Sequence, residues 1–121
     1  MEIDVWWKNG ELWLGHDEPQ YKITLDWLCA SSLRLIHCKD GVTFEYLLKK
    51  NGALGLGLNL FYHTNEHYAL TTRGQVIVLP GQDLLDGSIQ MMPEMSSRVY
   101  PNEQKNKVVA VCSDAVKNLY E

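Results

Sequence analysis

The opening segment, MEIDVWWKNGELWLGHDEP, places acidic side chains and a histidine at spacings that suit metal chemistry. Glu2 and Asp4 lie two residues apart in an apolar segment, so in a strand they point to the same face. Two carboxylates on a half-buried face are costly unless a positive group holds them, and a divalent cation is such a group. His16 and Asp17 follow after a turn. An imidazole beside a metal-bound phosphate can transfer a proton at the leaving oxygen.

The turn between the first two strands decides whether His16 shares the face of the acids. A two-residue loop places His16 opposite Ile3, on the other face of the hairpin. A three-residue loop over residues 8–10 places His16 opposite Glu2, on the face of the acids. The hypothesis of a joint metal and proton-transfer site therefore predicts the three-residue loop.

Further polar residues follow the ends of later apolar segments. His37 and Lys39 close the segment LRLIHCK, His63 ends LNLFYH, and Glu94 follows a proline after SIQMM. Carboxylates and imidazoles from neighbouring strands suit Mg²⁺, Ca²⁺ or Mn²⁺, and Lys39 can neutralise a phosphate oxygen as a point charge. Each group also has a purely structural interpretation, such as a core position for His37 or a solvated strand end for Lys39.

Hydrophobic periodicity predicts the elements that must position these residues. Strands are expected at residues 2–7, 11–16, 33–38, 58–63, 68–72, 75–79, 88–92 and 107–112. Helices are expected at residues 22–31, 41–50 and 115–120, with a surface loop at 96–106. Strands mixed with a few helices indicate one α/β domain over residues 1–121.

Composition limits the classes of partner. The net charge of the chain is −4 without a cluster of Lys and Arg, which argues against nucleic-acid binding. No apolar run approaches the ~20 residues of a membrane span. The three cysteines, Cys29, Cys38 and Cys112, show no CxxC spacing and predict reduced thiols in a cytoplasmic protein.

The ordered segments EIDV, KNGELWLGHDEP, LRLIHCK and VAVCSDAV resemble the glycerophosphodiester phosphodiesterase-like family of the phospholipase C-like phosphodiesterase superfamily. The family pattern has Glu-x-Asp at a strand end, a turn with glycine, and then His-Asp. The EID of residues 2–4 and the HD of residues 16–17 match these motifs. The SD of residues 113–114 stands where the family has a terminal Thr-Asp pair.

The resemblance implies a TIM-barrel fold and metal-dependent hydrolysis of a glycerophosphodiester or a similar small phosphodiester. Glu2 and Asp4 would be metal ligands, His16 the general acid or base, and Lys39 the lysine on the substrate side. His37 falls at the family's third acidic ligand, and an imidazole there shifts the preference toward Mn²⁺ or Zn²⁺. His63 and Glu94 are further candidates for the pocket.

Departures from the family pattern give a second hypothesis. The family's His-Arg strand, which carries one of two catalytic histidines, would precede Met1. A full barrel has ~250 residues, so a chain of 121 residues is expected to form a shortened or incomplete TIM-like barrel whose open edges favour a homodimer. The alternative is therefore a catalytically inactive barrel remnant that serves as a binding or interaction module.

Overall fold

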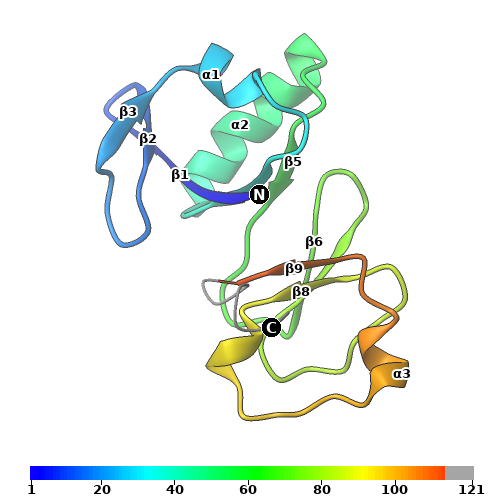
Figure 1. The fold of residues 1–121 in the computed structure, drawn as a ribbon. Coiled ribbons are helices and arrows are strands. Elements are labelled where there is room, and N and C mark those ends of the chain that lie inside the picture. The colour runs from blue at the N-terminus through cyan, green and yellow to red at the C-terminus, as the bar shows by residue number, and fades with distance from the viewer. Residues whose placement is uncertain (114–121) are drawn as a thin grey trace. The chain divides into compact units, whose positions relative to one another are not determined.

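The computed structural model describes residues 1–113 and divides the chain into two compact units (Figure 1). The first unit covers Met1–Tyr62, and the second begins at His63. Each unit has its own mixed β-sheet. Among the described residues, no helix has the length and apolar character needed to cross a membrane.

The first unit contains a five-stranded sheet with the strand order β3-β2-β1-β4-β5. Its strands are β1 (Glu2–Lys8), β2 (Glu11–Leu14), β3 (Tyr21–Ile23), β4 (Leu35–Cys38) and β5 (Asn59–Phe61). Helix α1 (Leu25–Cys29) precedes β4, and helix α2 (Gly41–Leu54) connects β4 to β5. Strand β1 is antiparallel to β2 and parallel to β4, and β4 is parallel to β5. The first strand of the chain therefore occupies the centre of the sheet.

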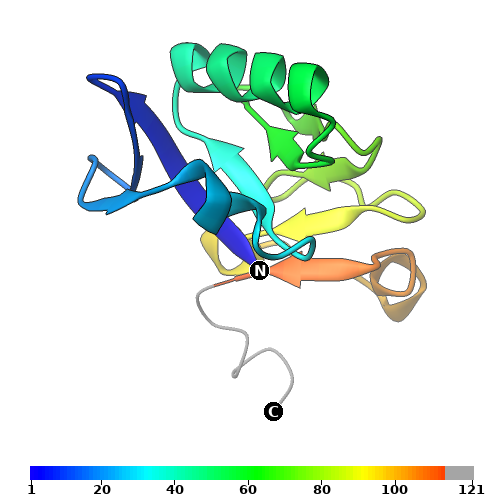
Figure 2. The same ribbon diagram turned by 90° about the horizontal axis from the view of Figure 1, so that it is seen from above.

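Helix α2 covers one face of this sheet (Figures 1 and 2). Val5 of β1, Cys38 of β4 and Leu47 of α2 are all fully buried in one apolar cluster. Side chains alternate along a strand, so the residues next to Val5 and Cys38 point to the other face. That alternation is what places Asp4 and His37 on the face opposite α2.

Capping residues set the bounds of α2. The Asp40 side chain accepts a hydrogen bond from the backbone N–H of Thr43, and Gly55 ends the helix in the left-handed conformation with φ 60°. The helix end expected at Asn51 comes too early. The Asn51 amide instead bonds both backbone groups of Leu58, at 2.8 and 3.1 Å, which ties the last turn of the helix to the chain that enters β5.

The hairpin of β1 and β2 has a two-residue turn, so the predicted three-residue loop is wrong. Lys8 pairs directly with Glu11. Asn9 and Gly10 have φ values of 53° and 75°, as the two central residues of a type I′ turn require. Asparagine tolerates the left-handed region and glycine adopts it freely, so the Asn-Gly pair closes the hairpin without an extra residue.

The second unit contains a four-stranded sheet with the order β6-β7-β8-β9. Its strands are β6 (Tyr68–Leu70), β7 (Val76–Val78), β8 (Ile89–Met91) and β9 (Ala110–Cys112). A 3-10 helix, η1 (Pro93–Met95), and a short helix, α3 (Asn102–Lys105), lie between β8 and β9. Helix α3 falls within the segment that the sequence predicted as a loop.

The predicted TIM-like barrel is wrong. The described residues form two mixed sheets of five and four strands and no closed barrel, which makes this a small α+β fold. A barrel needs a helical crossover before each new parallel strand, whereas β1, β2 and β3 follow one another as antiparallel neighbours. The homodimer expected from a gap in the barrel stays a prediction, and the helix expected at residues 115–120 lies outside the described residues.

Two glycine substitutions test the turn and the helix. A Cβ atom at Gly10 or at Gly52 meets no atom within 4 Å, so neither alanine causes a clash. Gly10→Ala is expected to lower the free energy of unfolding by about 1 kcal/mol because its φ is positive. Gly52→Ala, inside α2, is expected to raise it by about 0.5–1 kcal/mol. Urea denaturation measures both, and shifts of the same sign would contradict the turn assignment.

Candidate metal centre

Two acids and a histidine converge on the face of the first sheet opposite α2. The parallel register pairs Asp4 of β1 with His37 of β4 and Glu2 with Leu35. The alternation of side chains then places Glu2, Asp4 and His37 on one face. One carboxylate oxygen from each acid and one ring nitrogen of His37 all lie within 4.8 Å of one another. Ligand atoms at this spacing can surround a single cation.

The environment of Asp4 keeps it ionised. The Asp4 and His37 side chains are 15% and 16% exposed, and Asp4 Oδ1 lies 3.0 Å from His37 Nδ1. Burial raises the pKa of Asp4, but hydrogen bonds to His37 and Glu2 and the charge of Lys39 outweigh it and bring the pKa to about 2. These interactions favour the charged carboxylate of Asp4 over its neutral form.

Packing on β5 orients the ring of His37. The imidazole stacks on Phe61, with ring centroids 4.7 Å apart and planes 12° from parallel. Phe61 is fully buried, so the surface against which the imidazole packs is fixed. This contact directs Nδ1 toward Asp4 and gives His37 the rigid support that a metal ligand needs. Sequence reasoning missed Phe61 because only the register of β4 and β5 brings it beside His37.

Lys39 follows β4 directly, and its charge acts on Asp4 of the cluster. Its backbone N–H donates to the carbonyl of Val5 at 3.0 Å, which extends the pairing of β1 and β4 by one residue. The half-buried Lys39 side chain acts on Asp4 through its charge. The cluster therefore combines two carboxyl groups, an imidazole and an ammonium group.

His16 is not a member of the cluster of Glu2, Asp4 and His37. Its side chain is 79% exposed, and its Nδ1 lies 2.8 Å from a carboxylate oxygen of Asp17. The two-residue turn ends the ladder of β2 at Leu14, so the alternation of the strand does not carry His16 onto the face of the acids.

The backbone just before His16 is nevertheless bonded to β1 at Asp4, a member of the cluster. The N–H of Gly15 donates to the carbonyl of Asp4 at 3.3 Å, and its own carbonyl accepts the indole N–H of Trp6 at 2.7 Å. A Cβ atom at Gly15 would lie only 1.8 Å from the carbonyl oxygen of Glu18. Glycine is therefore required at position 15, where the turn folds back beside β1. His16 follows directly after Gly15, the residue whose N–H is bonded to Asp4.

His63 and Glu94, the two remaining site candidates, belong to the second unit. His63 Nδ1 lies 3.4 Å from the carbonyl oxygen of Thr64. Glu94 is exposed, accepts a hydrogen bond from the hydroxyl of Ser113, and lines a pocket of that unit. Asp114, the second member of the predicted terminal pair, lies outside the described residues.

Comparison of the chain with protein-family models, curated proteins and solved structures finds no match. The resemblance to the phosphodiesterase-like family therefore stays a prediction. The candidate metal centre rests on the geometry of Glu2, Asp4 and His37 in this chain.

The low pKa of Asp4 predicts a loss of stability in acid. A carboxyl whose pKa is about 2 when folded and 3.8 in its ordinary state stabilises the fold above about pH 4. That contribution, about 2 kcal/mol at neutral pH, is lost as the pH falls through about 2. Urea denaturation at about pH 7 and about pH 3 should show a smaller difference for Asp4→Asn than for the unmodified protein.

Asp17→Asn is the matched control, because the carboxylate of Asp17 is 92% exposed. This variant is expected to retain the full acid dependence. If stability fell equally between about pH 7 and about pH 3 in Asp4→Asn and in the unmodified protein, Asp4 would not be the source of the acid dependence.

Proposed function

We propose that the chain binds one divalent cation through Glu2, Asp4 and His37 and acts with it as a phosphodiester hydrolase-like protein. The observation that carries the proposal is the convergence of three ligand atoms within 4.8 Å on two parallel strands. The substrate class, a glycerophosphodiester or a similar small phosphodiester, follows from the resemblance of the EID and HD motifs to the phosphodiesterase-like family.

The donor set indicates which cations fit. Two carboxylates suit Mg²⁺, Ca²⁺ and Mn²⁺, and the imidazole of His37 favours Mn²⁺ among them. Metal ligands must be deprotonated, and the pKa of Asp4, about 2, meets that requirement at neutral pH. A bound cation supplies charge stabilisation to the phosphate oxygens.

Residues around the cluster supply the other functions of a phosphodiesterase. Lys39 places a second positive charge beside Asp4, where it can bind a non-bridging phosphate oxygen. His16 is the group that can move a proton, and its contact with Asp17 orients the imidazole. Gly15, the residue before His16, is bonded to the backbone carbonyl of Asp4, and the ring of His16 is open to solvent.

A second function, cation-dependent binding without turnover, is favoured by a specific observation. His16 lies outside the cluster of ligands and is 79% exposed, whereas general acids and bases work within hydrogen-bond reach of the reacting oxygen. In that case the centre binds a phosphate-containing partner and does not cleave it.

The cysteines support the proposal of a reducing compartment. Cys29, Cys38 and Cys112 are all free thiols. Burial raises the pKa of the Cys38 thiol to about 12, so it packs as an apolar group and does not react. Unpaired thiols are typical of cytoplasmic proteins.

Calorimetric titration with Mn²⁺ tests the cation site. The unmodified protein is expected to bind one equivalent, and Asp4→Asn or His37→Gln should weaken binding by about tenfold or more because each removes a ligand. His16→Gln is the matched control for His37→Gln, since it removes an imidazole outside the cluster, and its affinity should be unchanged. Absence of binding heat in the unmodified protein would overturn the cation site.

Hydrolysis of bis(p-nitrophenyl) phosphate with Mn²⁺ tests turnover. His16→Gln is expected to lower kcat by about 10²–10⁴, the usual contribution of a general acid or base. Lys39→Gln is expected to raise KM, because it removes a charge that binds the phosphate. Binding of Mn²⁺ without hydrolysis would reject the enzyme and leave the binding module.

A further inference from the structure

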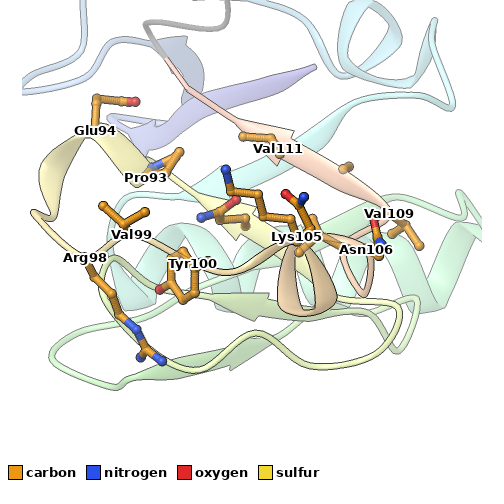
Figure 3. A pocket seen from close by; sticks show the side chains of 13 residues that line it. Pro93, Glu94, Arg98, Val99, Tyr100, Lys105, Asn106, Val109 and Val111 are labelled. Atoms are coloured by element: carbon orange, nitrogen blue, oxygen red, sulfur yellow. The ribbon is translucent and has the colours of Figure 1, made fainter. Parts of the chain in front are cut away.

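The second unit contains a pocket that is separate from the proposed metal centre in the chain. Its volume is about 570 Å³, and it lies between strands β8 and β9 and the segment that connects them (Figure 3). It is lined by Val111 of β9, Val109 directly before that strand, Gln90 of β8 and Val99 of the connecting segment. Pockets of roughly 300–1,000 Å³ with mainly apolar walls are the common form of small-molecule sites.

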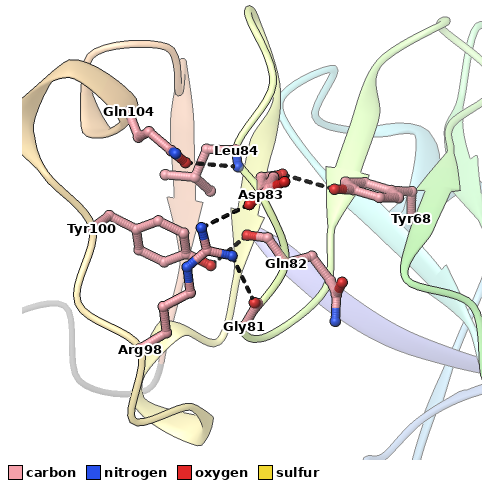
Figure 4. Close-up of polar contacts among 8 residues, drawn as sticks. All are labelled: Tyr68, Gly81, Gln82, Asp83, Leu84, Arg98, Tyr100 and Gln104. Carbon is pink, nitrogen blue, oxygen red and sulfur yellow. Dashed lines mark hydrogen bonds and ion pairs between the residues drawn. The ribbon is translucent and has the colours of Figure 1, made fainter.

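Polar contacts hold the connecting segment in place (Figure 4). Arg98 donates to a carboxylate oxygen of Asp83 at 2.7 Å and to the carbonyl of Gly81 at 3.1 Å. The Gln104 side chain accepts the backbone N–H of Leu84 at 3.3 Å. The wall of the pocket is therefore formed before any ligand arrives, which reduces the entropic cost of binding.

The same network anchors the base of the wall in the core of the unit. Tyr100 is only 7% exposed and packs with Val78 and Leu84. Its hydroxyl donates to the carbonyl of Gln82, and the Arg98 guanidinium carbon lies 4.6 Å from the centre of its ring. Arg98 therefore forms an ion pair with Asp83, which neutralises its charge, and packs on the ring of Tyr100.

Lys105 also lines the pocket, and unlike Arg98 it forms no ion pair with a described residue. Its side chain is exposed, and Figure 3 shows it reaching from α3 into the pocket. The amide side chains of Asn102 and Asn106 line the pocket beside it. These three side chains place one positive charge and several N–H donors together.

The one acid of the pocket lies at the other end of the strands. Glu94 follows the end of β8 and bonds the hydroxyl of Ser113, which follows the end of β9. Helix α3 leads into the start of β9, where the carbonyl of Lys107 accepts the N–H of Gly87 at 2.7 Å. The pocket therefore has a cationic end, an apolar middle and a hydrogen-bonded acid at the far end.

Apolar side chains at the mouth of the pocket indicate that the ligand is not only polar. Val99 is 86% exposed and Val109 is 65% exposed, and both line the same pocket. Apolar groups that gather at a concave site, unlike single exposed ones, mark a binding surface. A ligand with an apolar body would remove both valines from water.

We propose that this pocket binds a small amphipathic organic anion. Its carboxylate or phosphate lies at Lys105 between the amides of Asn102 and Asn106, and its apolar chain lies along Val99 and Val109. The positive charge of Lys105 repels an amphipathic cation from that end of the pocket. A purely polar anion such as inorganic phosphate makes no use of the apolar surface of the valines and is therefore expected to bind weakly.

Titrations in the presence of a metal chelator test the proposal independently of the cation site. The full chain is titrated with monomeric decanoate, decyl phosphate, decyltrimethylammonium and decanol, and binding is followed by calorimetry. Both anions are expected to bind more tightly than decanol, and decyltrimethylammonium least. The order of decanoate and decyl phosphate then identifies the preferred head group. Equal affinity for the anions and decyltrimethylammonium would overturn the proposal.

Charge variants locate the head group. Lys105→Gln is expected to weaken decanoate binding by about fivefold, the effect of one ion pair of about 1 kcal/mol at a solvent-accessible site. Lys107→Gln is the matched control, because Lys107 is exposed two residues away and does not line the pocket. An equal change in both variants would show a general charge effect and would overturn the assignment of Lys105.

A charged residue in place of an exposed valine tests where the apolar part of the ligand binds. Val99→Asp should weaken binding of every decyl compound except decyltrimethylammonium. Because the side chain of Val99 is highly exposed, this substitution should not unfold the protein, so weaker binding would not be due to a loss of folding. Val42→Asp, at a valine that is 63% exposed in the first unit, is the control and should leave binding unchanged. Unchanged binding in Val99→Asp would overturn the placement.

Discussion

The pairing of β1 with β4 is the constraint on which the first unit depends. It sets Asp4 beside His37, and the two residues are 33 positions apart in the chain. The same pairing sends Val5 and Cys38 to the opposite face, where α2 covers them. One register therefore decides both the apolar core and the polar cluster. A shift by one residue would exchange the two faces and bury the acids beneath the helix.

Local patterns predicted the elements better than they predicted their partners. The alternation that begins at Glu2 and the amphipathic segment that begins at Gly41 both became regular structure near the expected bounds. The predicted barrel was wrong because local periodicity does not indicate which strands pair. The barrel topology came from the family resemblance alone and not from the pattern of residues. No local signal sets the register of two parallel strands that are separated by a hairpin, a third strand and a helix.

The turn at Asn9 and Gly10 shows how a functional expectation can override a local rule. An Asn-Gly pair is the strongest sequence signal for a two-residue hairpin loop, and the structure has that loop. The three-residue loop is the only one of the two that brings His16 to the face of the acids, and the hypothesis of a joint site therefore predicts it. His37 reaches Asp4 instead, from a strand on the other side of β1. The sequence predicts the segment at residues 96–106 as a plain loop, because side-chain bonds such as those of Arg98 to Asp83 and Gly81 leave no periodic pattern in the sequence.

The central place of β1 in its sheet has a consequence for biosynthesis. Strands β1 and β2 are close in the chain and can close their hairpin locally during synthesis, but the second neighbour of β1, β4, follows only after about 20 further residues of β3, α1 and their connections. During that interval one edge of the nascent hairpin is unpaired and open to other chains. Negative charges on an open edge discourage intermolecular strand pairing. Glu2 and Asp4 place such charges on the strand whose edge is open during that interval.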